Sequence, residues 1–155
     1  MNAEDNLIRL RIALPPPPKP VGNYTPWVLA GNLLFTSGHV PASAEGIRTV
    51  GKLGLDMSVE EGYRAARQTG LAILATVRSA LGSLDRVERV VKVLGLVNAA
   101  PDFTDHPKVI NGCSDHLAEV FGENGRSSRS AVGAGSLPNG VATEIEAIFI
   151  VRLPG

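Results

Sequence analysis

The sequence contains a single cysteine, Cys113, among its 155 residues. One thiol cannot form a disulfide within the chain, which excludes a disulfide-stapled fold and indicates a reducing compartment. No run of apolar residues approaches the length of a membrane span. Residues 1–14 carry acidic side chains early and no long apolar stretch, unlike a signal peptide. We therefore expect a soluble, cytoplasmic protein that is not associated with a membrane.

The sequence also lacks an excess of either charge, because Lys and Arg number 15 and Asp and Glu number 15. A nucleic-acid partner favours clustered basic residues, so this balance argues against such a partner. Hydrophobic residues make up 44% of the chain and charged residues 19%, which is typical of a globular protein. We expect one domain at residues 21–153, preceded by an N-terminal extension at residues 1–20.

The extension ends in the proline-rich segment Pro15–Pro20. Proline fixes φ and removes backbone donors, so this segment is predicted to be extended. A PxxP segment can serve as a ligand for an aromatic groove of another protein. Here it runs directly into sequence that is typical of a core, which favours a stiff lead-in to the fold.

The sequence lacks several motifs of cofactor, metal and nucleophile chemistry, because it has no GxGxxG, Walker A, HExxH or GxSxG pattern. Cys113 and His116 lie one helical turn apart, which is half of a zinc site. No second pair of ligands has a matching spacing, and Cys113 falls on an apolar helical stripe. We therefore predict that Cys113 packs in the core and that no metal is bound, and the sequence gives no support for redox, NTP-driven or zinc-protease chemistry.

Hydrophobic periodicity predicts alternating strands and helices. Gly31-Asn32 joins two short apolar runs as a hairpin, and Ser58-x-x-Glu61 is a capping box before a helix that Gly82 closes. Residues 1–14 fit either a short edge strand or a helical turn. The predicted strands are 27–30, 33–37, 86–97, the segment around Arg129 and 141–151, with a short strand within 41–56, and the predicted helices are 58–81 and 104–121.

The resulting order ββ(β)αβαββ predicts an α+β, two-layer domain with a mixed sheet and two helices on one face. The strand at 86–97 is apolar on both alternating faces, which indicates a central position in the sheet or contact with another subunit. A single helix layer leaves the second sheet face uncovered. Its apolar content predicts that this face is buried between subunits.

Charged groups of opposite sign occur on the last two predicted strands. Arg129 lies among small residues, and Glu144 and Glu146 alternate onto one face of the final strand. A hairpin that brought them together would form either a small-anion site with an acid/base group beside it or a structural ion pair. The spacing alone leaves both interpretations open.

Three stretches, in the right order and at suitable intervals, resemble the RidA/YjgF family, also called the L-PSP endoribonuclease-like family. They are Val21-Gly22-Asn23-Tyr24, the run from Gly31 to Pro41, and the run from Ser128 through Leu137-Pro138 to Ile148. The resemblance implies a chorismate-mutase-like fold, assembled as a homotrimer with clefts between subunits. It also implies hydrolysis of reactive 2-imino or enamine acids to 2-keto acids and ammonia, without a cofactor.

Carried over position by position, the resemblance implies that Arg129 binds the substrate carboxylate and that Glu144 positions or activates water at the imine carbon. It implies that Tyr24 lines the cleft and that Ser37 and Gly38 border it.

The chain departs from the family pattern at three positions near the cleft. His39, which borders the cleft, stands where glutamine is usual, Asn23 replaces a proline, and Ala131 replaces a common cysteine. These changes are typical of a divergent subgroup. The leading hypothesis is an imine deaminase with a small carboxylate or imino-acid ligand, and the alternatives are a non-catalytic carboxylate-binding trimer and an endoribonuclease or translation inhibitor.

Overall fold

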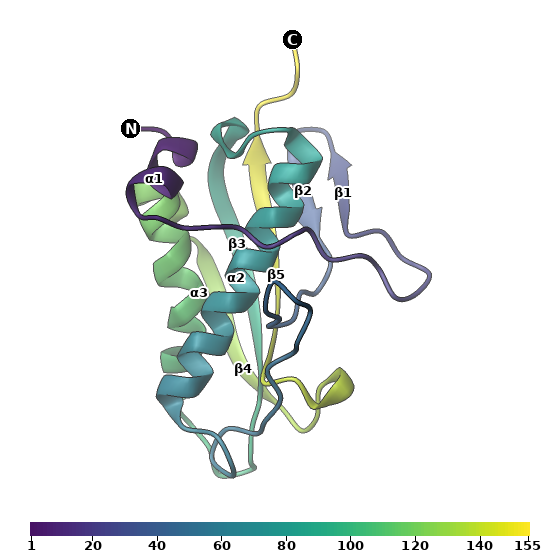
Figure 1. Cartoon of the computed structure of the whole chain (residues 1–155), viewed down its shortest axis with the longest axis vertical. Helices are drawn as coiled ribbons and strands as arrows, with labels where there is room; N and C mark the ends of the chain where they lie inside the picture. The colour runs from purple at the N-terminus through teal and green to yellow at the C-terminus, as the bar shows by residue number, and fades with distance from the viewer.

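The computed structural model describes all residues from Met1 to Gly155. Figure 1 shows its helices and strands in chain order. They are α1 (Ala3–Arg9), β1 (Trp27–Ala30), β2 (Leu33–Thr36), α2 (Val59–Leu81), β3 (Val87–Asn98), α3 (His106–Phe121), β4 (Ser128–Ala134) and β5 (Thr143–Val151), with short 3-10 turns at Leu84–Arg86, Gly122–Gly125 and Pro138–Gly140.

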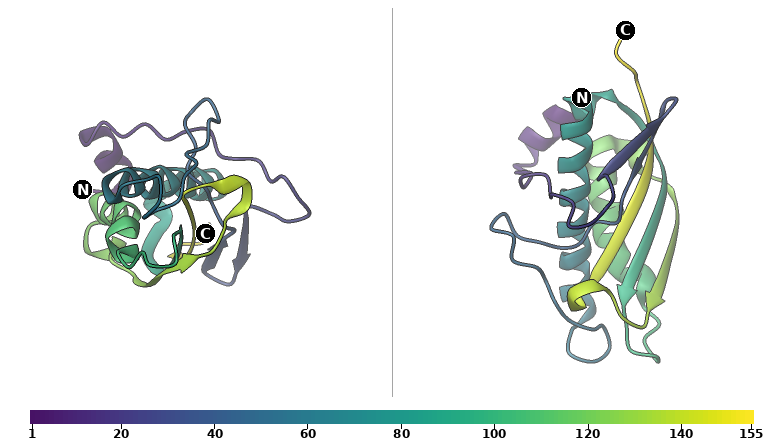
Figure 2. Two further views of the ribbon diagram at one scale, coloured as in Figure 1. Left: turned by 90° about the horizontal axis from the view of Figure 1, so that it is seen from below. Right: turned by 90° about the vertical axis from the view of Figure 1, so that its right-hand side faces the viewer.

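The strands form one mixed sheet of five strands in the order β1-β2-β5-β3-β4. β3 pairs with β4 in parallel and with β5 antiparallel, and β2 pairs antiparallel with both β1 and β5. The helices lie on one side of this sheet, and its other side is uncovered (Figure 2). The predicted two-layer α+β fold and the central position of β3 are confirmed.

The loop at 41–56 holds isolated bridges between residue pairs, and no continuous strand forms there. One bridge joins Ala42 to Arg48 across a tight turn, and another joins Val50 to Val141 just before β5. The short strand predicted in this loop is therefore wrong. Backbone bridges and the buried side chain of Leu53 attach the loop to the body of the domain instead.

The hairpin considered between the Arg129 segment and the final strand does not form, because β3 lies between β4 and β5. β3 is twelve residues long and supplies a hydrogen-bonding edge to each of these strands. The connection at 135–142 therefore crosses to the far side of β3 before β5 begins. Opposite charges that are close in sequence are consequently separated by a whole strand.

Sequence signals set both ends of α2 and its packing against α3. Both hydrogen bonds of the Ser58–Glu61 capping box are present, and Gly82 ends α2 in the left-handed conformation with φ of 82°. α3 packs closely on α2 at Gly112, where an added Cβ would lie 2.0 Å from the Tyr63 carbonyl oxygen. A side chain at residue 112 would push the two helices apart.

The N-terminal residues form the short helix α1. Of the two alternatives for residues 1–14, an edge strand or a helical turn, the helical one is therefore correct. Asn2 caps it by accepting a hydrogen bond from the Asp5 N–H, and Ala3 and Leu7 are buried in the core. Glu4 also forms an ion pair with Arg78 of α2 at 2.8 Å. These contacts attach the N-terminal extension to the helix layer. The domain boundary expected at residue 20 stays a prediction.

The proline-rich segment Pro15–Pro20 leaves α1 and crosses over α2 on its way to β1 (Figure 1). It contains no helix or strand, as predicted from its prolines. None of the helices is long and apolar enough to span a bilayer.

Candidate functional site

A pocket of about 780 Å³ opens beside the point where β2 ends against β5. Five of the predicted site residues line this pocket: Tyr24, Ser37, Gly38, His39 and Glu144. They come from a turn before β1, from the end of β2 and from β5, which the sheet brings together. The structure thus places these five residues at one site within a single chain, and their roles stay predictions.

A β-bulge after β2 shapes the floor of this pocket. Phe35 pairs with Ile148 and His39 pairs with Ile145, so three residues on one strand oppose two on the other. Gly38 lies in the bulge, where an added Cβ would be 3.0 Å from the Glu144 carboxyl carbon. A side chain at residue 38 would therefore require the Glu144 carboxyl group to shift by a few tenths of an ångström.

Glu144 is half-buried, and its carboxyl group lies on the sheet face that no helix covers. Burial raises its pKa above the ordinary value, and the negative charge of Glu146 raises it further. No cation forms an ion pair with it in this chain. A carboxyl group with a raised pKa beside open space is suited to exchanging a proton with water or with a ligand.

Ser37 and Tyr24 form the side of the pocket that faces β1. The Ser37 hydroxyl donates to the Thr25 carbonyl oxygen at 2.5 Å, and the Ser37 N–H donates to the Pro26 carbonyl oxygen at 2.9 Å. These bonds fix the end of β2 against the turn that carries Tyr24. The Tyr24 side chain is 48% exposed, which leaves its ring available to a ligand.

His39 is buried, and its ring is directed into the protein. Nδ1 donates to the Ser37 carbonyl oxygen at 2.7 Å, so Nε2 accepts from the Thr76 hydroxyl of α2 at 2.8 Å. Burial lowers the pKa of His39, which keeps the ring neutral. With both ring nitrogens engaged, His39 supports the pocket wall through the bulge and α2.

Arg129 does not line this pocket. It lies on the edge strand β4, where it pairs with Val93, while Glu144 pairs with Leu96 on the opposite side of β3. Its guanidinium donates to the Ser114 hydroxyl at 3.0 Å and to the Pro107 carbonyl oxygen at 3.4 Å, both on α3. It forms no ion pair, so the structural pairing with Glu144 or Glu146 that the spacing left open does not occur within the chain.

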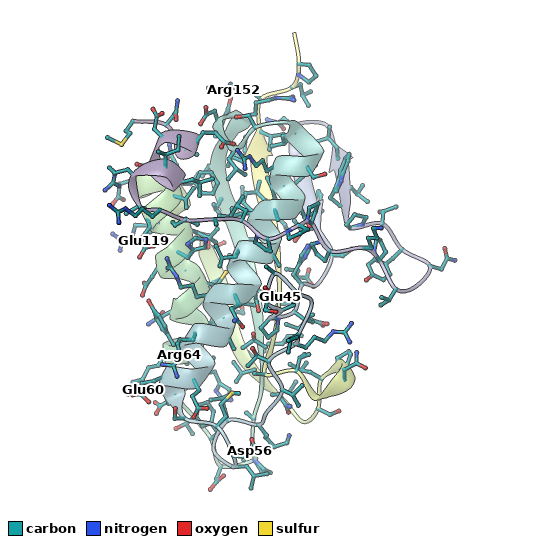
Figure 3. All side chains as sticks on the ribbon, in the orientation of Figure 1. Glu45, Asp56, Glu60, Arg64, Glu119 and Arg152 are labelled. Atoms are coloured by element: carbon teal, nitrogen blue, oxygen red, sulfur yellow. The ribbon has the colours of Figure 1, made fainter.

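The outer wall of the pocket is formed by residues that no sequence motif marks as site residues. Pro15–Pro20 and the residues around Arg48 line it, together with Asn139 of the turn before β5. Figure 3 labels Glu45 on the loop that carries Arg48, beside α2. The available signals were the run of prolines and the length of the loop at 41–56, and neither shows by itself that the two segments meet.

Cys113 is fully buried in the core, as predicted, and burial raises its pKa to about 12. His116 is also fully buried, and neither of its ring nitrogens has a hydrogen-bond partner. Burial lowers the pKa of His116 to about 4. No group of three or more His, Cys, Asp or Glu side chains is arranged to hold a metal ion.

The family model described as "YjgF/chorismate_mutase-like, putative endoribonuclease" matches residues 4–144. The chain belongs to this family. The RidA/YjgF resemblance is thereby confirmed, and the match also covers α1 and the proline-rich segment.

Two curated relatives and one solved structure illustrate the range of the family. Protein TCP17 of Trypanosoma cruzi is 44% identical over 144 residues, covering 92% of this chain and 90% of its own. The 2-iminobutanoate/2-iminopropanoate deaminase of Dermatophagoides farinae is 28% identical over 141 residues, covering 91% and 95%. The crystal structure of a "putative endoribonuclease" from Shewanella oneidensis MR-1 has a TM-score of 0.93 at 32% identity, covering 97% and 100%.

Proposed function

We propose that this protein hydrolyses 2-imino and enamine acids to 2-keto acids and ammonia, in a cleft between subunits. The observation that carries the proposal is Glu144, a half-buried carboxyl group with a raised pKa that lies against Gly38 in an open pocket. Such a group can hold a water molecule and accept its proton. The electrophilic carbon of an iminium needs little further activation.

The proposed reaction adds water across the C=N bond and then breaks the C–N bond. Glu144 accepts a proton from water as the oxygen attacks the imine carbon, and the proton passes to the nitrogen. The new hydroxyl group then gives its proton to the nitrogen as the C=O bond forms and the C–N bond breaks, so the nitrogen leaves as ammonia. The carbon atom becomes the carbonyl of a 2-keto acid. The Gly38 N–H donates no backbone hydrogen bond within the chain, so it is free to orient the ligand beside Glu144.

The substrate carboxylate needs a cation, and we assign it to Arg129 of a second copy of the chain. Arg129 lies outside the pocket of its own chain and has no carboxylate partner there. The uncovered sheet face carries apolar residues that a second copy would bury, among them Phe35, Leu94, Leu96 and Val132. We propose that, in a homotrimer that stacks these faces, the β4 edge that carries Arg129 lies beside Glu144 of the next subunit.

The D. farinae relative supports this reaction, because it is named as a deaminase of 2-imino acids and aligns over 91% of this chain. The endoribonuclease descriptions of other relatives favour RNA as an alternative substrate. The balance of 15 basic and 15 acidic residues argues against a nucleic-acid partner. Ligand binding without turnover is the third outcome that the experiments separate.

The test measures keto-acid release from imines that an amino-acid oxidase produces in the same reaction. Arg129→Ala and Glu144→Gln should each remove at least about 99% of the activity, since each deletes an interaction with the reacting molecule. Size-exclusion chromatography with light scattering should show that both variants keep the assembly of the wild type. Full activity of either variant, or RNA cleavage that survives both, would contradict the proposal.

A mixing experiment tests the position of the cleft. When the two inactive variants are unfolded together and refolded, some subunit pairs combine an intact Arg129 with an intact Glu144. Activity should then return to a fraction of the wild-type level if the two residues act across an interface. No recovery from an assembled mixture would show that both residues must come from one chain.

A further inference from the structure

Beyond Glu144 the pocket has an outer part that a three- or four-carbon acid would leave empty. One wall is the extended segment Pro15–Pro20, and another is the hairpin at 42–48, closed by a 2.8 Å hydrogen bond from the Ser43 N–H to the Ile47 carbonyl oxygen. The volume of about 780 Å³ lies within the range of roughly 300–1,000 Å³ that is usual for pockets of larger ligands. The pocket therefore has room for a long side chain.

Both walls are fastened to the body of the domain. Helix α1 holds one end of the proline-rich segment, and Ile12 and Leu14 pack against the core just before it. On the hairpin side, the Thr49 hydroxyl donates to Gln68 of α2 at 2.7 Å, and its carbonyl oxygen accepts from the Ala142 N–H at 3.1 Å. Arg48 directly precedes this fastened residue, so its backbone position is set relative to β5.

The outer part of the pocket carries two cations without partners. Arg48 on the hairpin and Lys19 on the proline-rich segment both line the pocket, and neither forms an ion pair in the chain. Both side chains are exposed, so each can reach a ligand from the solvent side of the pocket. One acid, Glu45, also lines this part and is exposed and unpaired.

We take half-buried Glu144 as the inner end of the pocket and the exposed Arg48 and Lys19 as its outer end, with apolar lining between them. Proline rings and the Tyr24 side chain supply much of that surface. A ligand that matches this arrangement has a carbon to be attacked at one end, methylene groups in the middle and an anion at the other end. A guanidinium holds such an anion well, because its planar fork donates two parallel hydrogen bonds to a carboxylate.

We propose that the pocket selects 2-imino acids with a second acidic group at the end of the side chain, and that Arg48, assisted by Lys19, binds this second group. The proposal rests on the proposed function, which assigns the inner end to the imine carbon and Arg129 to the first carboxylate. It names the substrate class of the same site. It also gives a purpose to the proline-rich segment and the long loop, which the hydrolysis itself does not require.

The first experiment compares kcat/KM for imines made from glutamate or aspartate with kcat/KM for imines made from alanine or leucine. The wild type should favour the dicarboxylic imines, and Arg48→Ala should lower that preference about tenfold, since a hydrogen-bonded ion pair is lost. Arg48→Lys should retain part of the preference. Arg64→Ala is the matched control, because Arg64 lies on α2 outside the pocket (Figure 3) and should leave the preference unchanged.

The second experiment measures binding by calorimetry, with 2-oxoglutarate and 2-oxobutyrate as stable probes. The assignment is supported if the wild type binds 2-oxoglutarate more tightly than 2-oxobutyrate and Arg48→Ala abolishes this difference. If the same result comes with no turnover of any imine, the proposed hydrolysis alone fails. Equal binding of the two acids, or a preference that Arg48→Ala retains, overturns the assignment whatever the turnover. If Arg48→Ala weakens the binding of mono- and dicarboxylic ligands equally, the assignment is also overturned, because Arg48 would then bind the first carboxylate.

Discussion

The two faces of the sheet are built from the same strands and serve different purposes. On the helix-covered face, Val93, Ile145 and Phe149 are completely buried. On the opposite face, Phe35 remains 38% exposed and Val132 43% exposed. Alternate residues of one strand thus divide between stabilising the fold and facing outward, and Glu144 lies on the outward face, where a carboxyl group remains accessible.

The largest effect is expected from emptying the covered face. Phe149→Ala should lower the free energy of unfolding by about 3–5 kcal/mol, because it leaves a cavity in a closely packed core. Urea unfolding followed by circular dichroism measures this loss. Phe35→Ala, on the outward face, should lose clearly less, and an equal loss would show that the assembled protein buries both faces to the same depth.

A charge on the outward face should act on assembly more than on the fold. Ile148→Lys places an ammonium group on the apolar surface that we propose to be buried between subunits, where an unpaired charge is unfavourable by several kcal/mol. Light scattering should show smaller particles with unchanged circular dichroism. Ile8→Lys is the control, because Ile8 of α1 is 78% exposed, and an unaltered assembly of Ile148→Lys would place the interface elsewhere.

The helix layer contains a group that should make the fold sensitive to acid. Burial lowers the pKa of His116 to about 4 in the folded chain, whereas an exposed histidine titrates near 6.5. The unfolded chain therefore binds the proton first, and stability that is complete above pH 6.5 should fall by about 1.4 kcal/mol per pH unit between 6.5 and 4.

His116→Leu removes this titration and two ring nitrogens that have no hydrogen-bond partner. Urea midpoints measured from pH 7 to pH 4.5 should decline less steeply in this variant than in the wild type. His39, whose pKa is also lowered by burial, keeps its contribution in both proteins. Parallel declines would show that His116 is not the group responsible.

The smallest effect is expected at Glu144. Its raised pKa means that the folded state disfavours the ionised carboxyl group, so Glu144→Gln should increase stability at pH 7. The gain should stay below about 1 kcal/mol, because solvent screens a half-exposed group, and it should vanish at pH values where the carboxyl group is protonated in both states. A loss of stability at pH 7 would indicate that the carboxylate stabilises the fold. That result would contradict its interpretation as a functional group that reduces stability.

Local signals predicted most of the fold. The Ser58–Glu61 capping box and Gly82 gave the bounds of α2 to within one residue, because both depend on hydrogen bonds within a single turn. The apolar pattern of β3 predicted its central position. The strand expected within 41–56 did not form, since its residues attach to Val141, Ala99 and one another as separate bridges.

The candidate site was predictable only in part. Recognisable motifs contain Tyr24, Ser37, Gly38 and Glu144. The pairing of β2 with β5 brings these residues together. The relation of Arg129 to Glu144 could not be predicted from their spacing in the sequence, because β3 lies between their strands. Arg48 carries no motif, and only the loop attachments reveal that it lines the pocket.

The sequence by itself determined the helix caps, the strand periodicity and the family, since each depends on neighbours within a few residues or on motifs in a fixed order. Tertiary structure alone decided that the glutamate of β5 lies against a glycine bulge of β2 and that Arg129 belongs to a different edge of the sheet. It also decided that a proline-rich segment and a distant hairpin enclose one pocket. These relations arise from strand order and long-range packing, which no local pattern encodes.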